Sequence, residues 1–324
     1  MDESRYHLRE YLERDYASQA RVSHRLNPER QITEQELRRW EKILRTPPSV
    51  FHPFVVEERS SGTGVAFGQL MTESDALDPR FLWAGASVDP DHQGQGVGRY
   101  LADVIEQEAR RRGTVGLWAR ARADRPRDLA FLERRGFRER GRRWRARLEL
   151  PATGYSSIPR REDVLGAEGI EFTTLAEEGP ARPDVQKRVH ELFAAVEADE
   201  PRAGVYTSLT FEQFVTVNLE GPGFLPSAFF LARNGGRYIG LSNLELLPGE
   251  PGVLHQVLTG TLREFRGRGI ATELKRRTAE FAQTHGFRSI RTENDSRNQP
   301  MWAINQKLGY RQEVVLVEWG KTLA

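Results

Sequence analysis

Cysteine is absent from this chain of 324 residues, and its absence limits the chemistry open to the protein. Without a thiol there is no disulfide, no cysteine-ligated zinc and no cysteine nucleophile. Lysine is scarce as well: five lysines stand among the 48 basic residues, so arginine carries most of the positive charge. The formal net charge is only +2. That balance gives no global argument for a nucleic acid or a membrane as the partner.

Long apolar runs are also missing. None approaches the roughly 20 residues that a membrane span requires, and the first residues are charged, unlike the apolar core of a secretion signal. We therefore expect a cytoplasmic protein with no membrane partner. The composition, 38% hydrophobic and 29% charged, is typical of folded domains. At this length two domains are expected.

Two glycine-rich stretches show that the chain contains a repeat. "HQGQGVG" begins at His92 and "FRGRGIA" begins at Phe265, 173 residues later. Gly136 and Gly309, each followed by an aromatic residue, are separated by the same 173 residues. Two landmarks with one offset indicate an internal duplication without gaps between them.

Hydrophobic periodicity and turn residues predict the same order of elements in both halves, β-α-α-β-β-β-α-β-α-β. This order predicts an α+β fold, with one mixed, mainly antiparallel sheet flanked by helices in each half. The predicted domains are residues 1–150 and 169–324, joined by a polar linker at 151–168. The first half is expected to have strands at 6–11, 53–58, 65–72, 81–88, 115–121 and 142–150, and helices at 14–26, 33–44, 97–112 and 127–135. The second half is expected to have strands at 170–175, 228–232, 238–246, 254–261, 289–292 and 313–318, and helices at 183–198, 210–219, 270–284 and 301–307.

Each glycine-rich loop lies between a predicted strand and a predicted helix. The first turn of a helix has unpaired N–H groups, and glycine lets a ligand approach the backbone closely, so such a loop suits phosphate. The dinucleotide-binding fingerprint fails because Arg99 stands where its last glycine would be. No Gly-Lys-Ser/Thr follows either loop, which excludes the NTPase P-loop. A simpler explanation, a tight turn with no ligand, becomes weak when two loops share one register.

The two loops, Gln93-x-x-Gly96-x-Gly98 and Arg266-x-x-Gly269-x-Ala271, resemble motif A of the GNAT superfamily of N-acetyltransferases. The resemblance covers both halves and implies a tandem member of that family. It implies that acetyl-CoA is the cofactor, with its pyrophosphate on the loop amides and its pantetheine arm along the preceding strand. The cofactor-binding residues that it implies are Val88, Gln93, Gly94, Gln95, Gly96, Val97 and Gly98 in the first half, and Thr259, Thr261, Arg266, Gly267, Arg268, Gly269, Ile270, Ala271, Asn298 and Met301 in the second.

The same resemblance points to candidate catalytic residues. In family members a base often lies eleven residues before the first residue of motif A, which is His255 in the second half and Leu82 in the first. Strand alternation predicts that His255 faces the same side as Thr259 and Thr261. Glu245 on the preceding strand is the alternative base. The tyrosine that many members use as general acid is replaced by Leu132 and by Asn305, and Asn305 could hydrogen-bond the cofactor sulfur.

We therefore expect an acetyl-CoA-dependent N-acetyltransferase without a metal, in which a primary amine of a small molecule attacks the acetyl group directly. The second half is expected to be catalytic, and the first to bind cofactor without reacting. The alternatives are a non-catalytic CoA-binding sensor and a protein or peptide N-acetyltransferase. The two halves are expected to form a pseudo-dimer within a monomer, with a homodimer as the alternative. The arginine-rich run at 134–150 alternates like a half-exposed strand, so nucleic acid is not the expected partner.

Overall fold

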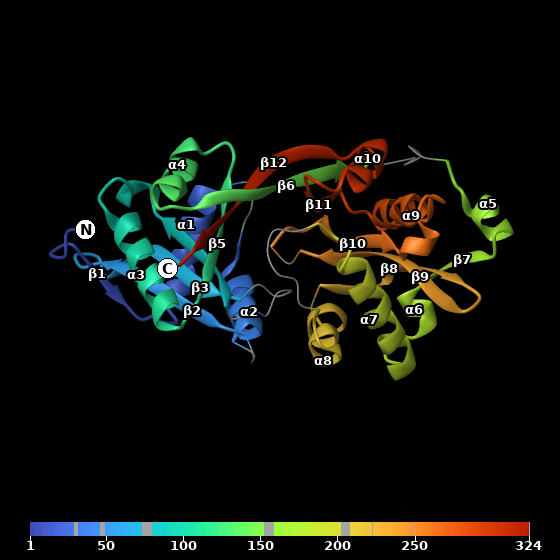
Figure 1. Cartoon of the computed structure of the whole chain (residues 1–324), viewed down its shortest axis with the longest axis horizontal. Helices are drawn as coiled ribbons and strands as arrows, with labels where there is room; N and C mark the ends of the chain where they lie inside the picture. The colour runs from blue at the N-terminus through green and yellow to red at the C-terminus, as the bar shows by residue number, and fades with distance from the viewer. Residues whose placement is uncertain are drawn as a thin grey trace. The chain divides into compact units, whose positions relative to one another are not determined.

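The computed structural model describes residues 1–28, 32–45, 49–72, 80–151, 159–201, 208–221, 223–247 and 249–323. These residues form two compact units (Figure 1). Unit 1 contains Met1–Arg140 together with Val317–Ala324, and unit 2 contains Gly141–Arg202 together with Ser208–Leu316. The fold class is as predicted: each unit is α+β, with one mixed and mainly antiparallel sheet between helices.

Unit 1 is built on a sheet in the order β1-β2-β3-β4-β5-β12. Its parallel pair is β4 and β5, and helices α1 and α3 pack against β3. Its elements are β1 (Tyr6–Arg9), α1 (Asp15–Leu26), α2 (Glu34–Leu44), β2 (Phe51–Glu58), β3 (Thr63–Met71), β4 (Phe81–Val88), η1 (Pro90–His92), α3 (Val97–Arg111), β5 (Gly116–Arg122), α4 (Pro126–Arg134) and the end of β12 (Arg311–Thr322).

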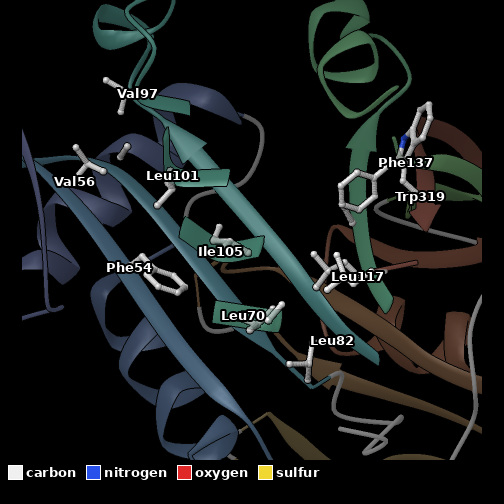
Figure 2. Packing of buried hydrophobic residues seen from close by; sticks show 14 of the residues in the cluster. Phe54, Val56, Leu70, Leu82, Val97, Leu101, Ile105, Leu117, Phe137 and Trp319 are labelled. Carbon is white, nitrogen blue, oxygen red and sulfur yellow. The ribbon is translucent and has the colours of Figure 1, made fainter. Parts of the chain in front are cut away.

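The core of unit 1 is formed where α3 packs on the sheet. Val97, Leu101 and Ile105 recur at helical spacing on α3 and are buried against strand residues such as Leu70 and Leu82 (Figure 2). Burying such side chains stabilises the unit by roughly 1.5–3 kcal/mol each. This packing fixes the start of α3, and with it the glycine-rich loop, against the end of β4.

Unit 2 has a sheet in the order β6-β11-β10-β9-β8-β7. Helix α9 packs on one face of this sheet and α7 on the other. Its elements are β6 (Arg138–Glu149, from Gly141), α5 (Glu162–Ala167), β7 (Ile170–Thr174), α6 (Leu175–Glu178), α7 (Pro183–Glu197), α8 (Phe211–Phe214), η2 (Val215–Leu219), β8 (Phe224–Asn234), β9 (Arg237–Leu246), β10 (Val253–Thr261), η3 (Arg263–Phe265), α9 (Ile270–Thr284), β11 (Ser289–Asp295), α10 (Gln299–Lys307) and the start of β12.

The last strand of each half belongs to the other unit, which the boundaries predicted at 1–150 and 169–324 do not anticipate. Strand β6 pairs antiparallel with β11, and its Ala146 and Leu148 lie in the core of unit 2. The end of β12 lies next to β5, and its Val317 and Trp319 lie in the core of unit 1 with Phe137 (Figure 2). The duplication is nevertheless exact in register, since β6 and β12 begin and end 173 residues apart.

Several local predictions differ from the structure. The linker predicted at 151–168 contains helix α5, while residues 152–158 lie outside the described part. The short helix α6 was not predicted, although Thr174 and Glu177 form a capping box at its start. The helix predicted at 210–219 is a single α-turn, α8, that continues as the π-helical turn η2.

Candidate active site

The two glycine-rich loops have the same conformation. Gly94 and Gly96 in unit 1, and Gly267 and Gly269 in unit 2, all have φ between 79° and 89°. That left-handed region is strained for residues with a Cβ, so both positions of each loop require glycine. Gly96 and Gly269 are the N-cap residues of α3 and α9, and as glycines they offer no side-chain cap to the first N–H groups. These donors are free to bind an anion.

The side chain of the first residue of each motif is hydrogen-bonded to the end of the preceding strand. The Gln93 side-chain amide donates to the Val88 carbonyl (3.1 Å), and the Arg266 guanidinium donates to the Thr261 carbonyl (3.3 Å). The two bonds connect equivalent positions in the two units. Arg266 also pairs with Asp199 (2.5 Å), whose pKa is lowered by its hydrogen bonds from Arg263 and Arg266. The predicted motif residues Gln93 and Arg266 therefore brace the strand end as well as the loop.

The remaining predicted loop residues fall into three groups. The side chains of Val97 and Ile270 are buried in the cores, so only their backbones can face a ligand. Gln95 accepts hydrogen bonds from Arg5 (2.8 Å) and Tyr6 (2.7 Å), so its side chain connects the loop to the N-terminal segment of unit 1. Three further residues complete the loops. Gly98 packs against Val88, and Ala271 lies in the first turn of α9. Arg268 lies at the exposed edge, with its guanidinium over the ring of Phe265.

What covers the N-cap glycine differs between the units. A Cβ atom on Gly96 would lie 3.1 Å from the backbone nitrogen of Met1, so main chain approaches this loop. A Cβ atom on Gly269 would lie 2.6 Å from the guanidinium of Arg161. The backbone N–H of Arg161 is bound to Glu273 on α9 (3.2 Å), which keeps the residue beside the loop. A cation beside the positive end of a helix is favourable when an anion binds both. Sequence reasoning missed Arg161, which lies outside the motif.

The parallel strands next to each loop separate before they end. In unit 1 the pairing of β4 with β5 covers Phe81–Trp83 and Gly116–Trp118, and in unit 2 that of β10 with β11 covers Val253–Gln256 and Ser289–Thr292. Both strands of each pair, which are fully described, continue beyond those residues. Strand residues past this point have backbone groups available to an extended ligand. Thr259 and Thr261 lie in the part of β10 that extends beyond its pairing with β11, which we call the free part of β10. Binding of a pantetheine arm there stays a prediction.

His255 and Glu245 form a pair across β10 and β9. They are opposite each other in register, and His255 Nδ1 lies 3.0 Å from Glu245 Oε1. A carboxylate only accepts, so in the neutral imidazole the proton lies on Nδ1 and Nε2 keeps its lone pair. Both side chains are about one-third exposed, at 32% and 39%. The two residues predicted as alternative bases thus form one accessible histidine–carboxylate pair, and the role of either as a base stays a prediction.

The prediction that His255 faces the same side as Thr259 and Thr261 is wrong. The register of β10 against β9 shifts by one residue between Gln256 and Thr259. Thr259 therefore pairs with Ser242, on the α9 face, whereas His255 pairs with Glu245, on the α7 face. Strand alternation fails at a β-bulge because two residues of one strand oppose one of the other.

Asn298 and Met301 lie at the start of α10, and Asn305 lies in its last turn. Asn305 is fully buried, its Nδ2 donates to Asn294 Oδ1 (3.3 Å), and its Oδ1 has no partner among the described residues. The predicted bond from Asn305 to the cofactor sulfur stays a prediction. The burial of the side chain argues against it, and so does the unpaired atom, because Oδ1 accepts hydrogen bonds and cannot donate one to sulfur. Asn298 caps α10 by accepting from the Met301 N–H (3.3 Å). Binding of cofactor by Asn298 and Met301 also stays a prediction.

The described residues contain no cluster of metal-binding side chains and no helix long and apolar enough to cross a membrane. The arginine-rich run lies on β6, where Arg145 and Arg147 pair with Glu293 and Glu313 (2.6 Å each). These neutralised arginines form a strand surface, as the alternation of the run predicted.

Comparison with known proteins gives the same assignment for both halves. The sequence model described as "Acetyltransferase (GNAT) family" matches residues 8–137 and 187–310. Curated relatives match locally: the [ribosomal protein bS18]-alanine N-acetyltransferase of Escherichia coli is 42% identical over 53 residues. That match covers 16% of this chain and 36% of the relative.

Among solved structures, a tandem GNAT protein from the clavulanic acid biosynthesis pathway has a TM-score of 0.74 at 20% identity. The match covers 98% of both chains. A GCN5-related N-acetyltransferase from Sphaerobacter thermophilus has a TM-score of 0.72 at 19% identity, with 98% of this chain and 95% of that one covered. At these identities the matches establish the tandem fold.

Proposed function

The chain belongs to the acetyltransferase (GNAT) family, and from this membership we propose that it transfers an acetyl group from acetyl-CoA to a primary amine in unit 2. The observation that carries the choice of unit is the His255–Glu245 pair beside the free part of β10. At the position that matches His255, unit 1 has Leu82, which is buried and has no proton to exchange.

In the proposed reaction, acetyl-CoA lies with its pyrophosphate on the loop at Gly269 and its thioester beside the free part of β10. His255 Nε2 takes a proton from the amine, directly or through water, and the nitrogen lone pair attacks the thioester carbon. The carbon–sulfur bond then breaks, and the thiolate leaves with the electron pair and is protonated from solvent. Glu245 holds the imidazole in the required tautomer and stabilises its protonated form.

A small-molecule amine is the proposed acceptor. A protein or peptide N-terminus is the second candidate, and the local similarity to a ribosomal-protein alanine acetyltransferase favours it. A CoA sensor without catalysis is the third. Unit 1 is proposed to bind cofactor without reacting, because its loop has the same conformation while a catalytic pair is missing from the matching position.

The test is thiol release from acetyl-CoA with a panel of small amines and of peptides with free N-termini. Gly269→Glu, which adds a strained Cβ and a negative charge to the loop of unit 2, should abolish release. Gly96→Glu makes the matched change in unit 1 and should preserve it. Loss of activity only in Gly96→Glu would move the reaction to unit 1. If CoA binds but neither amines nor peptides stimulate release, the sensor replaces the enzyme.

A further inference from the structure

A buried polar cluster lies under the β-bulge of β10. Gln256, Asn243, Ser242 and Thr278 are each at most 5% exposed. The Gln256 amide is fully satisfied: Nε2 donates to Ser242 Oγ (3.1 Å) and the Asn243 carbonyl (2.8 Å), and Oε1 lies 3.2 Å from Thr278 Oγ1. Buried polar side chains are costly unless their partners are all present, so this cluster favours one arrangement of its strands.

Two side-chain bonds of this cluster replace bonds of the strand ladder. The Asn243 carbonyl, which opposes the bulge, accepts from the Gln256 side chain. The backbone N–H of Leu258, within the bulge, donates to the Asn243 side chain (3.2 Å). The side chains of Asn243 and Gln256 thus bind the backbone groups that a bulge leaves unpaired. We call these two residues the bulge lock.

Unit 1 has neither the lock nor the bulge. Its β3–β4 register is unbroken from Ala66↔Val88 to Met71↔Trp83. Trp83 and Ile105 stand at the positions that match Gln256 and Thr278, and both are buried hydrophobic residues. The difference follows the internal duplication residue by residue, so unit 1 serves as a reference for what the bulge changes.

The bulge changes which residue of the strand faces which helix. In unit 1, Leu82 belongs to the core under α3. In unit 2 the residue at the same position, His255, faces away from α9, and its neighbour Gln256 contacts Thr278 on α9 instead. The pairing with the parallel neighbour shifts too: Phe81 opposes Gly116 in unit 1, whereas Val253 opposes Ser289 in unit 2. A one-residue slip turns every side chain of a strand to the other face.

We propose that Asn243 and Gln256 are positioning residues that hold the phase of β10 and so keep His255 beside Glu245 on the α7 face. This proposal rests on the proposed function only where kcat is the measurement; the position of His255 can be tested without it. Without the lock, β10 can pair as β4 does, which turns His255 under α9 and leaves Glu245 without its partner.

Gln256→Met removes the amide at similar volume. It should lower kcat about 10–100-fold, which is at most the lower end of the 10²–10⁴-fold that general-base catalysis contributes, with less than a threefold change in the Kd of CoA. Asn243→Leu should act in the same direction, while Asn243→Asp keeps an acceptor for Leu258 and should restore most of the activity. Ile290→Val, a core change on the neighbouring strand, controls for lost packing and should keep kcat within twofold.

A double-mutant cycle separates positioning from general destabilisation. If the lock acts through His255, the double variant Gln256→Met with His255→Gln loses no more activity than His255→Gln alone. Losses that multiply would overturn the proposal, and so would a wild-type kcat in a folded Gln256→Met.

A second readout needs no acceptor. When Glu245→Gln is the only substitution, it should change the ¹⁵N chemical shifts of the His255 imidazole. When Gln256→Met is already present, adding Glu245→Gln should leave these shifts unchanged. If the response survives in Gln256→Met, the lock does not hold the pair. If it disappears while no amine is acetylated, the lock stands and the proposed function fails.

Discussion

At the scale of residues, the contact between His255 and Glu245 predicts unequal effects of their substitution. His255→Gln removes the base and should lower kcat about 10²-fold or more, since general-base catalysis contributes 10²–10⁴-fold. Glu245→Gln keeps a hydrogen-bond acceptor but removes the charge, so it should cost less, about tenfold. Steady-state kinetics with the best amine measures both. Equal losses, or a larger loss in Glu245→Gln, would make the carboxylate the base.

Arg161 carries a prediction about the cofactor. Its guanidinium lies over Gly269, and no ion pair to it is found within the described ranges. Arg161→Gln should weaken acetyl-CoA binding about tenfold, because one charge-assisted bond to a phosphate is lost. Arg160→Gln is the matched control, since Arg160 pairs with Glu280 instead (2.5 Å).

Acetyl-pantetheine, which lacks the pyrophosphate, provides the decisive comparison. Calorimetry or kinetics with this substrate should show no difference between Arg161→Gln and the unaltered protein. A loss that persists with acetyl-pantetheine would mean that Arg161 acts on the structure of unit 2 and leaves the pyrophosphate alone.

At the scale of elements, helix α9 contains a lysine with a strongly altered pKa. Lys275 is fully buried, its Nζ lies 4.9 Å from the ring centre of Tyr310, and burial lowers its pKa from 10.5 to about 7. Between pH 7 and 10.5 the unfolded chain therefore binds more protons than the folded chain. The free energy of unfolding should therefore rise with pH across this window. Below about pH 7 Lys275 is protonated in both states, so the rise is absent there.

Lys275→Met should flatten this rise and increase stability at neutral pH, by on the order of 1–4 kcal/mol. Urea unfolding between pH 6 and 10 measures both effects. Lys307, exposed on α10, offers a control: Lys307→Met should leave the slope unchanged. A steep slope that survives in Lys275→Met would show that another group causes it.

The elements also show how far the sequence could predict this structure. Helix α9 and its counterpart α3 were predicted to within a residue, because amphipathic spacing and a glycine at each end define them locally. The bulge in β10 was missed because it depends on Asn243 of another strand. One local signal was present: Gln256 interrupts the apolar alternation of Leu254 and Leu258, and a polar residue at a core position requires a partner.

At the scale of the whole molecule, the exchange of end strands lies beyond what the sequence could predict. Strands β6 and β12 are equivalent copies, so their patterns fit either sheet equally well. What differs is their contacts: within unit 1, Lys321 pairs with Glu106 (2.7 Å) and Glu318 with Arg120 (2.9 Å). Side chains distant in sequence thus decide which sheet each strand completes.

The exchange predicts that each unit is destabilised by a change in the opposite half of the sequence. Val317 is 1% exposed in the core of unit 1, and Ala146 is fully buried in the core of unit 2. A buried, unpaired carboxylate should cost about 3 kcal/mol or more. Val317→Asp should therefore speed amide hydrogen exchange in β4 and α3, and Ala146→Asp should speed it in β10 and α9. The reverse pattern would mean that each end strand completes the sheet of its own half. Because unit 2 contains His255, acetylation should be more sensitive to Ala146→Asp than to Val317→Asp.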